Sequence, residues 1–331
     1  MTIVKKNNSL QEIAKYIKEN DDYLIIGHID PDGDAVGSIM AYKFLLDKLG
    51  KNSLLLLHSD LRQEYDLLFK YLNPNEYYIY KDIDKNKLAK FDKVIALDSA
   101  NIERLGNYKP IIEDCFIVNI DHHYDNSRFG DLNYVNSDDA AVGKIIYDLV
   151  ELLDIEITDD IGTAIALAVL ADTGSLKYPN SDPASFRLIA DLKEKNIDIV
   201  EINRFLQSYS SLEYLKLLSK GLANIKTAKA GKIAWLVLNK EEIDSIDIDD
   251  KEIKNFVNYP RDIKGVEVGI SFIEKKKDFI DISFRSLNYV DVSEIAHKFG
   301  GGGHPRAAGT KREGNLEEVV ERVIDEVKEN V

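Results

Sequence analysis

The sequence has very little cysteine, with Cys115 as the only one among 331 residues. No intrachain disulfide can form, which favours a reducing compartment, and we interpret Cys115 as a small buried hydrophobic residue. Long apolar runs are also missing. The longest, 161–171, is far short of the roughly 20 residues that cross a bilayer, and residues 1–9 hold no apolar core of a signal peptide. We therefore expect a cytoplasmic protein that neither spans nor binds a membrane.

Basic side chains are outnumbered by acidic ones, and the net charge at pH 7 is −15. Generic neutralisation of nucleic-acid phosphates requires a basic surface, so this charge argues against duplex nucleic acid as a partner. A small anionic substrate remains compatible with it, because bound metal ions would supply positive charge locally. The basic run 275–277 separates two strand-like runs, 266–273 and 279–284, and we interpret it as a hairpin turn rather than a nucleic-acid patch.

One loop is crowded with charged and ionisable groups. Residues 27–38 follow the apolar run 23–26 and hold one imidazole and three carboxylates, among them His28, Asp32 and Asp34. Carboxylates held a few ångströms apart repel one another and take up protons unless a cation lies between them, so the loop favours metal binding. In the alternative interpretation, Asp34 only caps the following helix and the loop is an ordinary turn.

Three further clusters of acidic residues or histidine also follow apolar runs: Asp98, the triplet 121–123, and Asp172. In an open α/β sheet, ligands gather outside the carboxyl ends of parallel strands, where residues that are distant in sequence converge. The pocket predicted in this way contains His28, Asp32, Asp34, Asp98, His122 and Asp172.

The predicted donor set is rich in oxygen, with imidazole in the minority, and therefore suits Mn²⁺ or Mg²⁺ better than a thiolate-type zinc site. It contains more ligands than one ion needs. Two metals about 3.5–4 Å apart, which clamp the attacking and leaving oxygens of a phosphoryl transfer, would use the whole set.

The order of these motifs resembles that of the DHH family of phosphoesterases, which is named after the triplet that stands here as Asp121-His122-His123. The resemblance includes the loop around His28, the strand end Leu97-Asp98-Ser99 and the run 171–175. It extends to 301–309, which is similar to the glycine-rich motif of the DHH-associated carboxy-terminal domain. The resemblance thus covers nearly the whole chain.

The resemblance also implies how the ligands divide between two Mn²⁺ ions, for which Mg²⁺ or Co²⁺ would substitute. Asp98 is expected to bridge both ions. A water or hydroxide between them is the expected nucleophile, because metal binding lowers its pKa from 15.7 toward neutrality. The remaining ligands would be His28 and Asp32 for one ion, and Asp34, His122 and Asp172 for the other.

The catalytic residues that the resemblance implies are Asp98, His122 and His123. Asp121 is expected to orient neighbouring groups rather than to bind metal. Two roles stay open for His123: it contacts the substrate phosphate or the leaving oxygen, or it is only a hydrogen-bonded partner of Asp98 or another ligand. His58 and His297 have no motif around them, and we interpret both as structural.

The glycine-rich run predicts an anion site in the second domain. Residues without Cβ let backbone amides approach an anion closely. An arginine nearby can pair bidentately with a phosphate or stack on a base, and we expect this domain to bind a part of the substrate remote from the scissile bond. The predicted substrate-binding residues are Arg285, Ser286, Gly301, Gly302, Gly303, His304 and Arg306.

Helical and strand periods alternate over the first half of the chain, including a predicted helix at 63–71. Such alternation is typical of an α/β fold with a mainly parallel, doubly wound sheet. We expect this phosphoesterase domain to occupy 1–185, a helical linker to follow at 186–229, and a smaller α/β domain to complete the chain at 230–331.

The two-domain organisation is most similar to the branch of oligoribonucleases and 3′-phosphoadenosine-5′-phosphate (pAp) phosphatases. It implies metal-dependent hydrolysis of short single-stranded RNA or DNA oligonucleotides, or of dinucleotides such as pApA, to mononucleotides, and of pAp to AMP. A cyclic di-AMP phosphodiesterase is the alternative enzyme. A silent nucleotide-binding sensor is the non-enzymatic alternative, against which the complete ligand set argues. The formation of a homodimer stays open.

Overall fold

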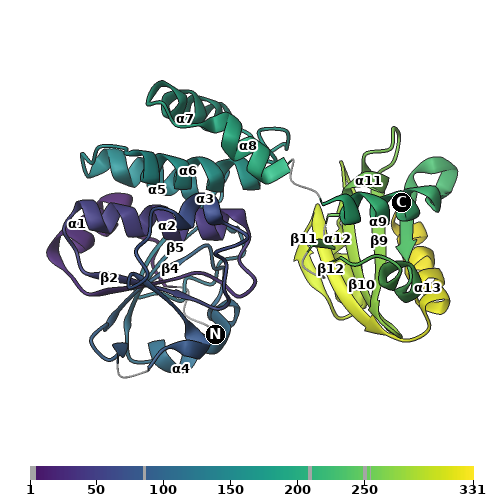
Figure 1. The fold of residues 1–331 in the computed structure, drawn as a ribbon, viewed down its shortest axis with the longest axis horizontal. Coiled ribbons are helices and arrows are strands. Elements are labelled where there is room, and N and C mark those ends of the chain that lie inside the picture. Colours follow the sequence, from purple (N-terminus) through teal and green to yellow (C-terminus); the bar gives the residue numbers. More distant parts are fainter. Residues whose placement is uncertain (1–4, 85–86, 208–210, 249–251, 254) are drawn as a thin grey trace. The chain divides into compact units, whose positions relative to one another are not determined.

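The computed structural model describes residues 5–84, 87–207, 211–248, 252–253 and 255–331. They form two compact units, Met1–Tyr209 and Ser210–Val331. Each unit consists of one six-stranded sheet covered by helices (Figure 1). The α/β class and the smaller second domain predicted from the sequence are therefore confirmed.

The first unit contains a fully parallel sheet in the order β3-β2-β1-β4-β5-β6. The sequences of its strands are nearly continuous apolar runs, because helices cover both faces of the sheet. The strand order reverses between β1 and β4, and ligands bind at such a switch point in open α/β sheets. The strands are β1 (Tyr23–Ile26), β2 (Ser53–Leu57), β3 (Tyr77–Ile79), β4 (Lys93–Leu97), β5 (Phe116–Asp121) and β6 (Leu132–Val135).

Side chains from alternate strand positions pack into two separate cores. On one face, Ile25 and Ile95 pack against the long helices α1, α2, α5 and α6. On the other face, Leu24 and Val94 pack against the 3-10 turn η3 and the short helix α4 (Figure 1). The helical elements of this unit are α1 (Leu10–Glu19), α2 (Gly33–Lys48), α3 (Asp66–Phe69), η1 (Tyr80–Asp82), η3 (Ile102–Tyr108), α4 (Lys109–Ile112), α5 (Val142–Leu152), α6 (Asp159–Asp172), α7 (Pro183–Glu194) and α8 (Ile199–Gln207).

Helix α2 crosses α6 at very close range, and glycine makes this possible. A Cβ on Gly37 would lie 2.6 Å from the carbonyl oxygen of Ala164 and 2.8 Å from the Cβ of Ala168. Gly143 on α5 has the same function, because its Cβ would lie 2.4 Å from the Cβ of Ala168. The three helices that surround the predicted site therefore pack through small residues.

We expect Gly37→Ala to destabilise the protein, because α2 and α6 would have to separate. Overpacking of this kind costs about 1–3 kcal/mol, which a lower urea midpoint at unchanged slope would report. Gly221→Ala is the matched control, because a Cβ at Gly221 would meet nothing closer than 3.6 Å. Equal midpoints for the two variants would contradict the close-packing argument.

The second unit contains a mixed sheet in the order β11-β12-β10-β9-β8-β7. Only β8 and β9 run parallel, and the other described neighbours are antiparallel. The elements are α9 (Leu212–Ala223), β7 (Lys226–Ala228), η4 (Lys229–Gly231), β8 (Ile233–Leu238), α10 (Lys240–Asp244), α11 (Asn258–Arg261), β9 (Val268–Lys276), β10 (Phe279–Ser286), α12 (Val292–Lys298), β11 (Gly302–His304), β12 (Ala307–Glu313) and α13 (Leu316–Asn330).

Several sequence-based expectations change in detail. The helix predicted at 63–71 shrinks to Asp66–Phe69, and Cys115 is only half-buried. The segment 186–229 does not stand apart as a linker: Leu188 and Ile202 belong to the core of the first unit, while Leu217 belongs to that of the second. The hairpin predicted around the lysine run is present as β9 and β10. Among the described residues, no helix has the length and hydrophobicity to cross a bilayer.

Candidate metal centre

The predicted ligands lie at the carboxyl ends of β1, β4 and β5, where the strand order reverses. His28 follows β1, Asp98 follows β4, and His122 follows β5. Asp98 adopts a left-handed backbone conformation with φ of 54°. Residues other than glycine rarely adopt this conformation, and such strain persists where the surrounding structure holds it, often at functional sites.

The first ligand group consists of His28, Asp32 and Asp98, whose donor atoms all lie within 4.8 Å of one another. The Nε2 of His28 is 3.6 Å from Oδ2 of Asp98. His28 and Asp98 are buried, and Nε2 of His28 and Oδ1 of Asp98 have no hydrogen-bond partner among the described residues. Burying polar atoms in this way is costly, so a cation between them is the group that these atoms fit.

The second ligand group consists of Asp34, His122 and Asp172, again within 4.8 Å of one another. The Nε2 of His122 is 3.7 Å from Oδ2 of Asp34 and 3.3 Å from Oδ2 of Asp172. Nε2 of His122 also lies 3.6 Å from Oδ1 of Asp98, so Asp98 faces both groups. A carboxylate in that position has one oxygen available for each of two ions.

Asp172 reaches the site from a helix rather than from a strand. It is the last residue of α6, whose close packing on α2 places it opposite Asp34. The apolar run before Asp172 is thus a buried helix, whereas the other three clusters follow parallel strands. Short or moderately long apolar runs do not distinguish buried helix from buried strand.

Helix α2 begins within the loop 27–38. Asp32 caps the helix by accepting hydrogen bonds from the amides of Asp34 and Ala35. The alternative in which Asp34 is the cap is therefore wrong. Asp34 instead accepts hydrogen bonds from the Ser38 hydroxyl at 2.9 Å and from the amides of Val142 and Gly143 at 2.7 and 3.0 Å. The amino terminus of α5 thus fixes the orientation of this carboxylate.

Backbone carbonyls select the tautomers of both ligand histidines. Nδ1 of His28 lies 2.6 Å from the carbonyl oxygen of Ile29, and Nδ1 of His122 lies 3.2 Å from that of Asp139. A carbonyl only accepts hydrogen bonds, so each Nδ1 carries the proton and donates it. In the neutral form of each ring, the lone pair is then on Nε2, which faces the carboxylates, and this is the form that binds a metal.

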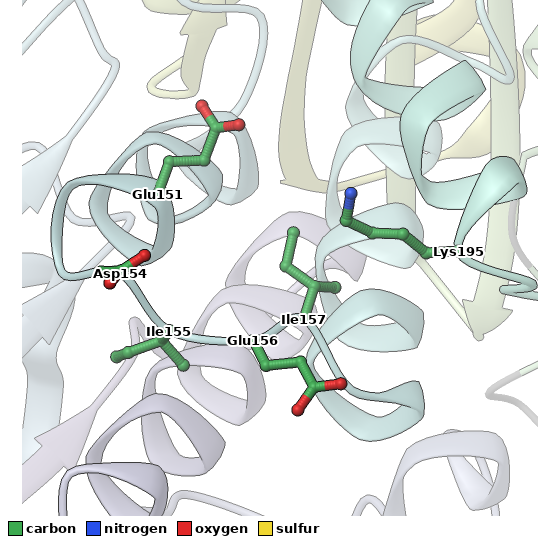
Figure 2. Close-up of a pocket in the computed structure, with 6 residues that line it drawn as sticks. All are labelled: Glu151, Asp154, Ile155, Glu156, Ile157 and Lys195. Carbon is green, nitrogen blue, oxygen red and sulfur yellow. The ribbon is translucent and has the colours of Figure 1, made fainter.

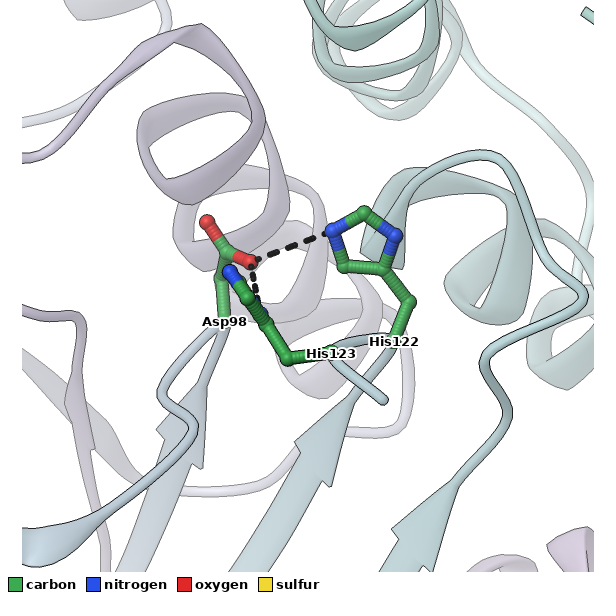
Figure 3. Close-up of side chains that lie close together, drawn as sticks. All are labelled: Asp98, His122 and His123. Atoms are coloured by element: carbon green, nitrogen blue, oxygen red, sulfur yellow. Dashed lines mark ion pairs between the residues drawn. The ribbon is translucent and has the colours of Figure 1, made fainter. Parts of the chain in front are cut away.

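His123 faces a different partner. Its Nδ1–H donates to Oδ1 of Asp121 at 2.8 Å and lies 3.6 Å from Oδ1 of Asp98. Figure 3 shows how His122 and His123 approach the same Asp98 oxygen from two sides. Asp121 is fully buried and also accepts a hydrogen bond from Asn126. This arrangement supports the expected orienting role of Asp121.

The charges of the cluster perturb its titration strongly. Burial, together with the nearby Asp98 carboxylate, raises the pKa of Asp34 to about 7. Burial lowers the pKa of His122, but the carboxylates of Asp34, Asp172 and Asp98 outweigh this effect and raise it to about 9. Without a cation, the repulsion between these buried carboxylates is relieved by bound protons. A divalent cation would take the place of those protons.

The second unit brings the other predicted residues together. Arg285 on β10 pairs in register with Ala307 on β12, which pairs with His304 on β11, so the three lie side by side across three strands. Gly301 and Gly303 are required by packing, because their Cβ atoms would lie 2.1 and 2.5 Å from backbone oxygens of β12. These glycines therefore permit the close approach of β12, a strand of the protein itself.

Ser286 and Arg306 make structural hydrogen bonds beside this row. The Arg306 guanidinium donates to the carbonyl oxygen of Val290 at 2.6 Å and to the Ser286 hydroxyl at 3.3 Å. The Ser286 hydroxyl donates to the carbonyl oxygen of Pro305 at 3.2 Å. Both side chains thus hold the segment next to His304 in place.

Sequence reasoning missed the residues that position the ligands, such as Ser38 and Asn126. Asn126 donates to Asp121 and to the carbonyl oxygen of Ser99, which follows Asp98. A single serine or asparagine carries no spacing signal, so no pattern could have identified them. His58 stacks on Tyr108 with ring centroids 3.8 Å apart, which agrees with the structural role expected for it.

A surface concavity elsewhere in the first unit contains none of the predicted site residues (Figure 2). It lies along the connection between α5 and α6, and most of its ionisable side chains are acidic. The lining residues are Glu151, Asp154, Ile155, Glu156, Ile157 and Lys195.

Comparison with known proteins agrees with the two-unit structure. Residues 22–173 match the DHH family N-terminal domain, and residues 230–331 match the DHHA1 domain. The chain is 31% identical over 321 residues to the bifunctional oligoribonuclease and PAP phosphatase NrnA of Thermus thermophilus, covering 96% of this chain and 93% of that protein. The chain belongs to the DHH family. The predicted class of phosphoesterase is thereby confirmed.

Three further proteins are similar to this chain, one in sequence and two in fold. The NrnA of Bacillus subtilis is 24% identical over 302 residues, with 90% of this chain and 91% of that protein covered. An exopolyphosphatase-related protein from Bacteroides fragilis has the same fold, with a TM-score of 0.87 and 24% identity over 97% of this chain and 95% of its own. RecJ of Thermus thermophilus, solved with Mn²⁺, has a TM-score of 0.57 and 13% identity, with 99% of this chain and 55% of that chain covered.

Proposed function

We propose that this DHH-family hydrolase cleaves short single-stranded oligonucleotides and dinucleotides such as pApA to mononucleotides, and that it converts pAp to AMP. The observation that carries the proposal is the pair of ligand groups at the switch point of the sheet, with Asp98 in one group and 3.6 Å from His122 of the other. The names of the NrnA relatives supply the substrate class, and the net charge of −15 agrees with a short substrate rather than duplex nucleic acid.

The donor chemistry supports two Mn²⁺ ions, with Mg²⁺ or Co²⁺ as substitutes. His28, Asp32 and Asp98 would hold one ion, and Asp34, His122 and Asp172 the other, with Asp98 shared. When bound, two such metals polarise the phosphoryl oxygens and make water nucleophilic at neutral pH. Hydrogen bonds to the main chain mean that the protein itself sets the direction of the ligand atoms of His28, His122 and Asp34.

His123 is proposed to contact the phosphate or leaving oxygen of the substrate. Its Nδ1–H is committed to Asp121, which fixes the plane of the ring. Asp121 raises the pKa of His123 against the opposing effect of burial, so the ring holds its proton more readily than an isolated imidazole. A protonated His123 would donate to developing negative charge through Nε2.

The second unit is proposed to bind a part of the substrate other than the scissile phosphodiester. All proposed metal ligands precede residue 173, whereas Arg285 and His304 lie in a separate compact unit. Their register across β10, β12 and β11 places a guanidinium and an imidazole on either side of the small residue Ala307. Such a row suits a phosphate or base.

We expect Arg285→Ala to raise KM for pApA far more than it lowers kcat. A charge-assisted hydrogen bond contributes roughly 1.5–3 kcal/mol, which corresponds to a loss of about ten- to a hundredfold in kcat/KM. A minimal chromogenic phosphodiester, which lacks the remote group, should be hydrolysed at nearly the wild-type rate. Equal losses on both substrates, with reduced metal content, would place Arg285 in the catalytic centre or in folding instead.

The proposed substrate class is tested by one comparative assay. Purified protein with Mn²⁺ is given pApA, pAp, cyclic di-AMP and single-stranded RNA of graded length, with duplex RNA as a control. We expect turnover of pApA, pAp and the shortest oligonucleotides. Faster turnover of cyclic di-AMP would favour the alternative phosphodiesterase, and binding of all substrates without turnover of any would favour a sensor.

A further inference from the structure

The turn after β10, residues 287–290, presents an exposed aromatic ring on an unusually well-fixed backbone. Tyr289 is 59% exposed, and Leu287 beside it is 44% exposed. An exposed tyrosine in a mobile loop has no preferred position. Tyr289 differs, because the backbone on which it stands is hydrogen-bonded to a buried carboxylate.

That carboxylate belongs to Glu267, which is only 2% exposed. Its Oε1 accepts hydrogen bonds from the amides of Asn288, Tyr289 and Val290 at 3.0, 2.7 and 3.0 Å. Its Oε2 accepts one from the Asn288 side chain at 2.9 Å. Burial opposes ionisation, but these donors outweigh it and lower the pKa of Glu267, so the charged form fixes the turn.

The turn is also tied to the segment that carries the predicted phosphate-binding residues. The Val290 carbonyl accepts from Arg306 at 2.6 Å, and the amide of Val292 donates to the carbonyl of Pro305 at 3.0 Å. Pro305 follows His304 directly, and the turn itself begins two residues after Arg285. The backbone that carries Tyr289 is therefore tied to the same segment as the row formed by Arg285, Ala307 and His304.

We propose that Tyr289 stacks on a nucleobase of the substrate and that Glu267 is a positioning residue that holds the ring for this contact. An aromatic ring next to cations is the arrangement that binds single-stranded nucleic acid without reading its sequence, because every base has a face on which to stack. The backbone that carries the ring is already fixed before binding, so less conformational entropy is lost when the base arrives. This inference rests on the proposed function and names the part of the substrate that the second unit binds.

The kinetic test compares Tyr289→Ala with Tyr289→Phe on pApA and on analogues in which one adenine is replaced by an abasic sugar. Loss of the ring should raise KM for pApA on the order of ten- to a hundredfold with kcat within about threefold, and phenylalanine should restore it. For the analogue that lacks the stacked base, wild type and Tyr289→Ala should be equal. Tyr259→Ala, which removes another exposed tyrosine of the same unit, is the control and should leave KM unchanged.

Glu267→Gln should raise the same KM without lowering kcat, and combining it with Tyr289→Ala should add nothing further. Additive effects, or equal losses on the abasic analogues, would overturn the proposal. Sedimentation that shows a dimer in wild type and a monomer in Tyr289→Ala, with unchanged KM, would also overturn it and assign the ring to self-association.

A binding measurement separates this inference from the proposed function. In EDTA, the fluorescence of a dinucleotide that contains 2-aminopurine should be quenched by wild type and Tyr289→Phe but not by Tyr289→Ala. Quenching without hydrolysis in Mn²⁺ would refute the proposed function and retain the stacking contact. Hydrolysis with the same quenching for all three proteins would retain the function and refute the contact.

Discussion

Replacing Asp98 with asparagine should abolish turnover while the protein remains folded. Asp98 faces both ligand groups, at 3.6 Å from Nε2 of His28 and 3.6 Å from Nε2 of His122, so its charge is the one that both proposed ions share. We expect kcat with Mn²⁺ to fall by at least about a thousandfold, which corresponds to roughly 4 kcal/mol of barrier. Steady-state hydrolysis of pApA measures the loss.

Asparagine is a better test than alanine, because it preserves both the shape and the backbone preference of aspartate. Asp98 has φ of 54°, and asparagine tolerates this left-handed conformation better than alanine. Thermal unfolding followed by circular dichroism should show a folded variant. Asp138→Asn, an exposed acidic residue of the same unit, is the control and should retain full activity. Activity of Asp98→Asn within about tenfold of wild type, about 1.4 kcal/mol, would exclude the shared role.

Removing the metal should have a comparably large effect. We expect EDTA to abolish hydrolysis and Mn²⁺ to restore it most effectively, because the proposed ligands are mixed carboxylates and imidazoles. Metal should also raise the melting temperature, since a cation offsets the burial and the carboxylate repulsion that raise the pKa of Asp34 to about 7 in the metal-free protein. Activity assays and thermal melts of the same samples check both effects.

Calcium provides the matched control for the metal. Ca²⁺ takes more oxygen ligands at longer distances than the compact groups around Asp98 offer, so it should stabilise the fold without supporting turnover. Efficient hydrolysis with Ca²⁺, or undiminished hydrolysis in EDTA, would contradict the site as proposed.

The sequence predicted which residues the structure brings together in the two ligand groups, because they occur in ordered motifs, each placed after an apolar run. It could not predict how they are oriented. Asp34 depends on amides of α5, more than a hundred residues away, and His122 depends on the carbonyl of Asp139. Main-chain partners carry no residue signature, so only the folded structure identifies them.

The boundaries between units were harder to predict for a related reason. Helices α7 and α8 are amphipathic. An amphipathic pattern shows that one face of a helix is buried, but it does not show which domain buries that face. Leu188 and Ile202 pack on the first core. In the second unit, the strand-like pattern at 266–273 predicted only a hairpin. A charged residue at the start of such a run gives no sign of the backbone amides from which it will accept hydrogen bonds.

The most direct test of the central claim is a titration of metal-free protein with Mn²⁺, followed by electron paramagnetic resonance. Two ions that share Asp98 should bind per chain and give an exchange-coupled signal, and Asp98→Asn should lose the coupling. Asp172→Ala, which removes a ligand from only one proposed group, should weaken one of the two binding steps. A single ion per chain, or two ions without coupling in the wild-type protein, would contradict the account.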